Sequence, residues 1–348
     1  MADTLTLRRP DDWHLHLRDE QEMRAVIGFS AERFGRAIVM PNLKPPVTSV
    51  ELARAYRERI LAAVPGKLAF EPLMALYLTE DTTPAEIDNA RASGIIAGVK
   101  LYPAGATTHS EAGVRSMTRV SSVLERMERC ALPLLIHGEV TDPQVDIFQR
   151  EQRFIEEVLA PLVARFAGLK VVLEHVTTRA AVEFVRGARA GVAATITPQH
   201  LLFNRNALFA GGMRPHHYCL PVLKEESDRQ ALLQAATSGN ARFFLGTDSA
   251  PHARVAKENA CGCAGIFSAH AALELYAEAF EAAGALERLQ AFASEFGADF
   301  YGLPRNSGNI TLIKESWRPP PHYAFGSDTL VPLRAGESVA WRLASSAG

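Results

Sequence analysis

The sequence has few cysteines, almost no excess charge and no long apolar run. Four cysteines, Cys130, Cys219, Cys261 and Cys263, are too few and too irregularly spaced for a disulfide framework. The 37 basic and 39 acidic side chains give a net charge of -2, which provides no electrostatic footprint for nucleic acid or an anionic membrane. No run approaches the roughly 18 apolar residues of a membrane span, and the first residues lack the apolar core of a signal peptide. We therefore expect a cytoplasmic protein that binds neither nucleic acid nor membrane.

Cys261 and Cys263 flank a single glycine. Such a pair could belong to a metal knuckle, but a zinc knuckle needs a second ligand pair, and the sequence has no second close cysteine pair. We interpret both as small thiols in a glycine-rich loop.

Length and composition are typical of a globular protein. Of the 348 residues, 47% are hydrophobic and 22% charged, which argues against disorder. Because α/β barrels commonly reach about 250 residues or more as one unit, we expect a single domain, 1–348. Within it, 303–348 is predicted to be a packed C-terminal extension with strands at 310–313 and 329–342 and a linker at 319–321.

Short apolar runs alternate with segments of helical periodicity. The runs predict eight strands, at 14–17, 37–40, 68–78, 95–101, 132–136, 170–173, 192–196 and 243–245. The periodic segments predict helices at 20–33, 50–63, 84–92, 117–129, 145–166, 178–186, 224–237 and 269–283. This alternation predicts an α/β fold, a (β/α)8 TIM-type barrel. The rival, an open doubly wound sheet, normally has a glycine-rich turn after its first strand, which is absent here.

Several of these helices begin with capping residues, and three connections are unusually long. The predicted caps are Thr48 or Ser49, Thr83 before Pro84, Thr177 or Thr178, and Ser268. The long connections are 103–116, 197–223 and 247–266. Long loops in a compact domain are usually functional or disordered.

His14 and His16 project from the same face of the first predicted strand, because side chains alternate along a strand. Taken alone, one of the pair could fill a polar niche while the other is exposed. Four further polar residues end later strands: Lys100, His137, His175 and Asp248. Each has an ordinary explanation as a core histidine, a rim lysine or a loop carboxylate. In a barrel, however, the carboxyl ends of all strands open onto one face, so together these six residues predict a metal site.

Six ligands are too many for one catalytic zinc, which typically takes three protein ligands and water. Two metal ions fit better. A neutral lysine amine can react with carbon dioxide to give a carbamate, whose two oxygens could bridge both ions, and burial beside cations favours the neutral amine. A bridging hydroxide would then be the nucleophile, since metal-bound water is acidified to near neutral pH.

Short motifs along nearly the whole chain resemble those of the amidohydrolase superfamily, and within it the dihydroorotases of the compact, single-enzyme bacterial type. The matching segments are 12–18 (DWHLHLR), 40–42 (MPN), 98–103 (GVKLYP), 137–139 (HGE), 174–175 (EH), 197–200 (TPQH), 218–221 (YCLP), 246–252 (GTDSAPH) and 261–265 (CGCAG). The sequence departs from the family pattern at His109 and His217. Neither is a ligand position, so the departures bear on lid kinetics and not on the reaction.

The resemblance implies reversible hydrolysis of (S)-dihydroorotate to N-carbamoyl-L-aspartate, the third step of pyrimidine (UMP) synthesis. It implies two Zn²⁺ per chain, one held by His14, His16 and Asp248 and the other by His137 and His175. N6-carboxylated Lys100 would lie between them. Asp248 would take the proton of the attacking hydroxide and deliver it to the leaving nitrogen. The resemblance also suggests a homodimer.

The same resemblance assigns substrate contacts. Arg18, Asn42 and His252 would bind the substrate carboxylate, and Arg18 supplies a suitable bidentate fork. The alternative for Arg18 is a surface salt bridge to Asp11 or Asp19. The other implied contacts are the backbone of Leu220 and Ala264, the side chains of His16 and His137, and Thr107 and Thr108 on a mobile lid, 103–109. The alternative for the two threonines is that they are solvated turn residues.

Two other functions remain open. One is a different cyclic amidase, a hydantoinase or allantoinase, which would use the same metals on another ring; the proposed carboxylate clamp favours an acidic substrate. The other is an inactive barrel that serves as a scaffold, which has no reason to keep six ligands.

Overall fold

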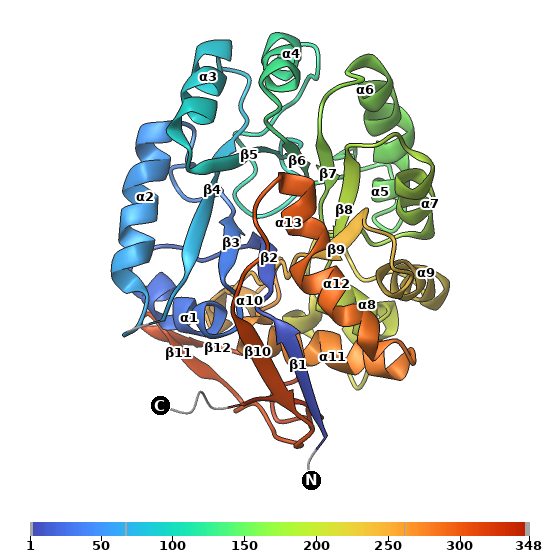
Figure 1. Cartoon of the computed structure of the whole chain (residues 1–348). Coiled ribbons are helices and arrows are strands. Elements are labelled where there is room, and N and C mark those ends of the chain that lie inside the picture. The colour runs from blue at the N-terminus through green and yellow to red at the C-terminus, as the bar shows by residue number, and fades with distance from the viewer. Residues whose placement is uncertain (1–2, 67, 261, 345–348) are drawn as a thin grey trace.

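The computed structural model describes residues 3–66, 68–260 and 262–344, and its centre is a barrel of parallel strands. Adjacent strands in the barrel are consecutive along the chain, so every connection is a crossover. The predicted (β/α)8 barrel is therefore confirmed (Figure 1). Its strands are β2 (Asp11–Leu15), β3 (Arg36–Val39), β4 (Glu71–Tyr77), β5 (Ile96–Leu101), β6 (Leu134–Ile136), β7 (Val171–Leu173), β8 (Val192–Ile196) and β9 (Phe243–Leu245).

The barrel closes between β2 and β9 just beyond the strand ends. The Asp248 N–H donates to the His14 carbonyl at 2.9 Å, and the His16 N–H donates to the Ser249 carbonyl at 3.1 Å. The first strand was predicted to run to Leu17, but β2 ends at Leu15. His16 nevertheless stays beside His14, because its backbone is tied to the chain that follows β9.

Helices surround the barrel (Figure 1). Ser49, Thr83 and Thr178 cap their helices as predicted, each accepting a backbone N–H. The predicted cap at Ser268 is wrong, since its side chain makes no capping hydrogen bond. The outer helices are α1 (Glu20–Arg33), α2 (Val50–Ala63), α3 (Pro84–Ser93), α4 (Ser121–Cys130), α5 (Arg150–Phe154), α6 (Ala160–Arg165), α7 (Arg179–Gly187), α9 (Glu226–Thr237) and α11 (Ala272–Ala282).

The helix predicted over 145–166 is wrong as one element: it starts at Arg150 and is interrupted by a π-turn, η1 (Ile155–Leu159). Pro161, two residues after this turn, has no N–H to donate into it, which accounts for the irregularity. The remaining short helices are α8 (Pro198–Leu202), η2 (Arg205–Leu208), η3 (Pro215–His217), α10 (Arg254–Lys257), η4 (Ala269–Ala271), η5 (Leu286–Arg288), α12 (Leu289–Ser294) and α13 (Phe296–Tyr301). Among the described residues, no helix is both long enough and apolar enough to span a membrane.

The amino-terminal end of the barrel is plugged with aromatic side chains. Trp13 stacks on Tyr301 of α13 with ring centroids 4.6 Å apart, and its edge meets Phe244 of β9 at 6.4 Å. A Cβ on Gly297 would lie 1.9 Å from the Trp13 Nε1, so only glycine lets α13 approach this closely. We call this end, with Trp13, Phe244, Gly297 and Tyr301, the closed end.

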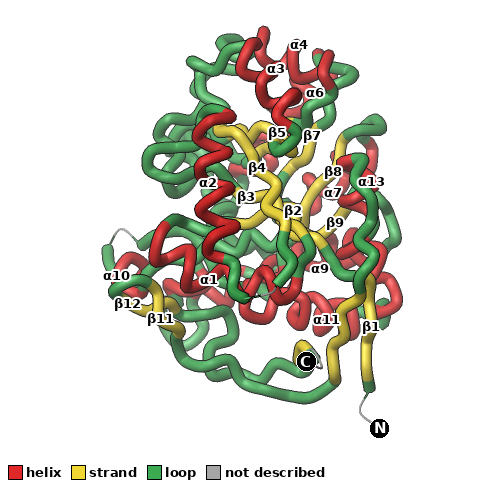
Figure 2. The backbone as a smooth tube through the Cα atoms, turned by 60° about the vertical axis from the view of Figure 1, so that its left-hand side comes forward, coloured by secondary structure: helices red, strands yellow, loops and turns green. Residues whose placement is uncertain are grey.

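The first and last strands of the described chain belong to a small sheet outside the barrel. β10 (Asn309–Ile313) lies between β1 (Thr4–Arg8) and β13 (Arg342–Leu343), all antiparallel. A hairpin of β11 (Tyr323–Phe325) and β12 (Asp328–Leu330) lies against α1 and α10 (Figure 2). The strand predicted at 310–313 is confirmed, whereas the one predicted over 329–342 is wrong, because a turn at 333–336 separates β12 from β13.

Candidate active site

The six predicted ligands all lie at the carboxyl ends of barrel strands, which we call the open end. His14 is in β2 and Lys100 in β5, and the other four residues lie just beyond β2, β6, β7 and β9. All six are buried. The barrel thus gathers side chains that are far apart in the sequence: His14, His16, Lys100, His137, His175 and Asp248.

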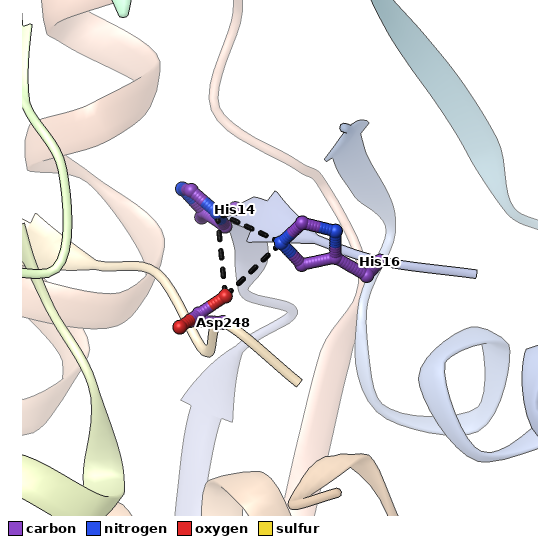
Figure 3. A group of neighbouring side chains, drawn as sticks. All are labelled: His14, His16 and Asp248. Carbon is purple, nitrogen blue, oxygen red and sulfur yellow. Dashed lines mark hydrogen bonds and ion pairs between the residues drawn. The ribbon is translucent and has the colours of Figure 1, made fainter. Parts of the chain in front are cut away.

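Three of the six form a compact group of potential metal ligands. The Asp248 Oδ1 lies 3.4 Å from the His14 Nε2 and 3.1 Å from the His16 Nε2. The two imidazole nitrogens are 3.3 Å apart (Figure 3). Each residue offers a ligand atom within 4.8 Å of the others, and the arrangement is typical of a site for a divalent cation.

The other three predicted ligands lie beside this group without being part of it. The His175 ring centroid is 4.9 Å from that of His14 and 4.9 Å from that of His137. Lys100 is fully buried, and its Nζ has no hydrogen-bond partner among the described residues. A buried ammonium without a partner is costly, so this position suits a modified or neutral amine better than a free cation.

Two carboxylates and one amide contact ring nitrogens of these histidines. The Glu174 Oε2 lies 2.9 Å from the His14 Nδ1, and the Glu139 Oε2 lies 2.8 Å from the His137 Nε2. The Asn42 Oδ1 lies 2.9 Å from the His16 Nδ1. Such partners fix the ring orientation of metal-binding histidines. Glu139 and Glu174 had no predicted role, although each stands within two residues of a predicted ligand.

Asp12 is a further residue whose role the sequence did not reveal. Its carboxylate is buried and accepts the Thr247 N–H at 2.9 Å, the Thr247 hydroxyl at 2.6 Å and the His14 N–H at 3.1 Å. It thus fastens the start of the barrel to its last strand, directly beside Asp248. Because Asp12 and Thr247 are 235 residues apart in the sequence, no local pattern could have indicated this contact.

The electrostatics of the open end suit cation binding. Burial, followed by the charge of Lys100, lowers the pKa of His14 and of His175 well below the usual value, so both imidazoles are neutral at pH 7. Burial also lowers the pKa of Lys100 to about 8. Burial alone would raise the pKa of Asp248, but hydrogen bonding to His16 and nearby positive charge lower it overall. Neutral imidazoles and an ionised carboxylate are the forms that bind metal.

Backbone strain is concentrated at this end. Arg18, His175 and Asp248 have positive φ angles of 62°, 41° and 45°. Such conformations cost free energy in residues other than glycine, and they cluster at active sites. Both His175 and Asp248 line a pocket at the mouth of the barrel.

The predicted substrate residues line the same enclosed pocket or touch its wall. The Arg18 Nε donates to the Pro251 carbonyl at 2.8 Å, and its NH2 group lies 2.9 Å from the His252 Nε2. Arg18 makes no salt bridge to Asp11 or Asp19, which pair with Arg36 and Arg59 instead. The pocket is lined by His14, His16, Arg18, Asn42, Tyr102, Thr107, Thr108, His137, His175, Leu220, Asp248, Ala250, Ala264 and Gly265.

The segment predicted to be a lid lies over this pocket. The Thr108 hydroxyl donates to the Ala264 carbonyl at 3.4 Å, and the Asn42 Nδ2 donates to the Thr108 carbonyl at 3.1 Å. Thr107 lies beside Thr108 in the lining. Both threonines are partly buried in the pocket lining, and the contacts of Thr108 join Asn42 to Ala264 across it.

The cysteines stand apart from this chemistry. Cys130, Cys219 and Cys263 are free thiols, and Cys261 lies outside the described residues. Burial raises the pKa of the Cys219 thiol to about 12, so it is protonated at neutral pH. Within the described residues, the only group of three or more His, Cys, Asp or Glu side chains placed to hold a metal is that of His14, His16 and Asp248.

Comparison with known proteins identifies relatives that match nearly the whole chain. The model of the amidohydrolase family matches residues 12–317. The chain is 66% identical to a dihydroorotase of Laribacter hongkongensis, covering 98% of this chain and 99% of that protein, and 64% identical to one of Nitrosomonas europaea, covering 99% of each. The crystal structure of dihydroorotase from Campylobacter jejuni superposes with a TM-score of 0.91 at 35% identity, covering 99% of this chain and 98% of the other.

Proposed function

This chain belongs to the amidohydrolase family and, within it, to the dihydroorotases, and on that premise we propose that its open end hydrolyses the ring amide of (S)-dihydroorotate. The product is N-carbamoyl-L-aspartate, the reaction is reversible, and it is the third step of pyrimidine nucleotide synthesis. The observation that carries the proposal is the convergence of the six buried potential ligands at the open end. Five of them line one enclosed pocket beside Arg18, and the Nζ of the sixth, Lys100, lies 5.1 Å from the ring centroid of Tyr102 in the same lining.

Metal dependence follows from the family and from the His14, His16 and Asp248 group. The proposal adds the number and identity of the ions: one Zn²⁺ at that group and a second at His137 and His175. Lys100 would lie between them as an N6-carboxylate, formed when its neutral amine attacks carbon dioxide and releases a proton. The burial of Lys100 and its lowered pKa support this step. When bound, such cations acidify water and polarise a carbonyl group.

Asp248 is the proton carrier in this proposal. Its carboxylate is ionised at neutral pH, so it can accept a proton from the oxygen that attacks the ring carbonyl carbon. As the carbon–nitrogen bond breaks, the carboxyl group returns that proton to the leaving ring nitrogen. Its backbone N–H is held by the His14 carbonyl, which keeps the side chain at the mouth of the barrel.

The remaining pocket residues bind and orient the substrate. Arg18, Asn42 and His252 hold the carboxylate, and the fixed donors of Arg18 select a planar anion. Leu220 and Ala264 offer backbone groups to the ring amide, while His16 and His137 face the ring. Thr107 and Thr108 close the lid over it and exclude bulk water.

The carboxylate clamp also separates this function from that of a hydantoinase or allantoinase. A neutral ring would leave the buried Arg18 guanidinium without an anionic partner, which is costly. We therefore expect hydrolysis of dihydroorotate to exceed that of unsubstituted hydantoin by about 10³-fold or more in kcat/KM. Equal rates on both rings would favour the alternative amidase.

The decisive experiment measures dihydroorotate hydrolysis with and without a chelator, together with the zinc content of the purified protein. We expect two zinc ions per chain, loss of activity on chelation and recovery on adding zinc. The Lys100→Ala variant should lose both metal and activity. Less than one zinc per chain with no hydrolysis would instead favour an inactive scaffold.

Three further parts of the proposal rest on the resemblance to the family. We propose a homodimer, which analytical ultracentrifugation would test, and a cytoplasmic location, which fractionation of the source cells would test. We also propose that 1–348 is one domain with 303–348 as its packed extension. Removal of residues 303–348 should then abolish cooperative unfolding of the remaining chain.

A further inference from the structure

Lys257, the last residue of α10, ties together two loops that line the pocket. Its side chain is buried, and its Nζ lies within hydrogen-bond distance of three carbonyl oxygens. The acceptors are Tyr218 at 2.9 Å, Cys263 at 2.9 Å and Gly265 at 2.5 Å. Since an ammonium group has three N–H donors, all of them are used.

Two of these acceptors flank Ala264. The carbonyls of Cys263 and Gly265 both point at the ammonium group, whereas the Ala264 carbonyl accepts the Thr108 hydroxyl and lies 3.0 Å from the His252 Nε2. The Ala264 carbonyl therefore faces the pocket, because the carbonyls of its two neighbours are held on the opposite side by Lys257. Gly265 adds to this constraint: its φ is +152°, and a Cβ there would lie 2.7 Å from the Ala250 carbonyl oxygen.

The third acceptor belongs to the opposite loop, two residues before Leu220. The Tyr218 carbonyl accepts both the lysine ammonium and the Gly265 N–H, the latter at 3.0 Å. The ammonium group thus bridges the two loops whose backbones the proposed function assigns to the substrate ring.

A buried cation at this position is unusual. Lys257 makes no salt bridge within the described residues; its contacts are backbone dipoles and the Tyr218 ring, whose centroid is 5.9 Å from the Nζ. Burial lowers the pKa of Lys257 to about 8. An apolar side chain of similar length could fill this space without the desolvation cost, which argues that the charge serves the site.

We propose that Lys257 is a positioning residue that sets the affinity for the cyclic substrate by fixing the backbone of Leu220 and Ala264. This inference rests on the proposed function. It assigns a role in ring recognition to a side chain that touches neither the metal ligands nor the carboxylate clamp.

The test compares Lys257→Met with Lys170→Met in the zinc-loaded enzyme. Lys170 is a matched control at the closed end. Its Nζ, like that of Lys257, donates to a backbone carbonyl, here that of Phe300 at 2.8 Å, and lies over an aromatic ring, that of Phe300. We expect KM for dihydroorotate to rise about 10- to 100-fold in Lys257→Met, with kcat within about 3-fold of wild type and zinc content unchanged. The control should keep wild-type KM.

Two additional measurements keep the inference open to refutation. Lys257→Arg, which retains the charge but replaces a compact ammonium with a planar fork, should recover only part of the affinity. Hydrogen exchange at the amides of 218–220 and 262–266 should accelerate in Lys257→Met and not in the control. If the methionine variant does not fold, the arginine variant and its exchange pattern provide the same test.

The outcomes separate the inference from the proposed function. An active wild type whose KM is unchanged by Lys257→Met would overturn the inference alone. Loss of kcat and zinc at unchanged KM would overturn it as well, because Lys257 would then act on the metal site. A zinc-loaded wild type that does not hydrolyse dihydroorotate would overturn both.

Discussion

The two ends of the same eight strands are built on opposite principles. At the closed end, Trp13 and Phe244 pack against α13, and the space is filled with aromatic rings. At the open end, histidines and carboxylates are held in a small pocket, some with positive φ angles. Trp13 and His14 are consecutive in β2, where the register with β3 shifts between Asp12 and Leu15. Trp13 packs on Phe244, whereas His14 lines the pocket. The barrel thus gains stability at one end and places its reactive groups at the other.

This division predicts which measurement each substitution will change. A change at the open end should reduce activity without much loss of stability, because strained and desolvated groups contribute little to folding. A change at the closed end should reduce stability and leave the activity of the folded molecules nearly intact.

Asp248→Asn should give the largest effect on activity. The amide cannot carry the proton and is a poorer metal ligand, so we expect kcat to fall by about 10³-fold or more. The melting temperature should stay within a few degrees of wild type, since asparagine tolerates the positive φ at this position. Steady-state kinetics and calorimetry would measure the two quantities.

Tyr301→Phe is the matched control, because it also alters one buried polar atom, but at the closed end. It should keep wild-type kcat. Retention of more than a tenth of wild-type kcat in Asp248→Asn would contradict the proton-carrier role.

Phe244→Ala should give the largest effect on stability. The ring is fully buried in the barrel interior, so we expect the free energy of unfolding to fall by about 3 to 5 kcal/mol. Urea titration would measure this loss, and kcat of the folded fraction should stay within about 3-fold of wild type. Phe209→Ala is the control, since Phe209 is 62% exposed and should change stability by less than about 0.5 kcal/mol. A loss of much more than 3-fold in kcat of the folded fraction would show that the two ends are coupled.

Arg18→Lys tests the substrate side of the open end. A lysine ammonium cannot reproduce the planar fork, so KM for dihydroorotate should rise about 10- to 100-fold while the unfolding free energy changes little. Arg36→Lys is its counterpart at the closed end, where the guanidinium makes two hydrogen bonds to Asp11 and lies over Trp13. That variant should lose stability and keep its KM. An unchanged KM in Arg18→Lys together with a raised KM in Arg36→Lys would show that Arg18 does not bind the substrate.

Periodicity and strand-end chemistry were enough to predict the barrel and the six potential ligands. Helices α1 and α2 begin and end where predicted, because their apolar periodicity is bounded by caps and turns. The ligands could be found because the barrel brings all carboxyl strand ends to one face, so their positions along each strand were sufficient. Their roles in metal binding and catalysis remain proposals.

The features missed from the sequence depend on contacts between distant segments. Glu174 reaches His14 across 160 residues, and Lys257 joins loops that no local pattern relates. The break in the helix predicted over 145–166 and the turn at 333–336 had local signals, Pro161 and Gly336, that the periodicity outweighed. Sequence patterns thus located the elements and the chemical groups, while the positioning contacts needed the tertiary structure.

His270, in η4, is a buried histidine that belongs to neither end of the barrel. It is buried beside α1, α11 and the C-terminal hairpin, close to Phe267 and Tyr323. Among the described residues, neither ring nitrogen has a hydrogen bond of good geometry, although the Leu333 backbone lies near. Burial, and then the charge of Arg33, lower its pKa to about 3. Unlike His14, this histidine has no carboxylate partner among the described residues, and we predict that it contributes only to packing.

The consequence is a defined dependence of stability on pH. The native state keeps His270 neutral, whereas the unfolded chain binds a proton below about pH 6.5, so stability falls as pH decreases from about 6.5 toward 3. His270→Phe removes that proton uptake and should lessen the loss of stability between pH 7 and 5.5 by about 1.3 kcal/mol, while kcat at pH 8 stays unchanged. Urea unfolding at the two pH values measures the difference. Equal pH slopes in wild type and variant would show that His270 titrates in the folded protein as it does in the unfolded chain.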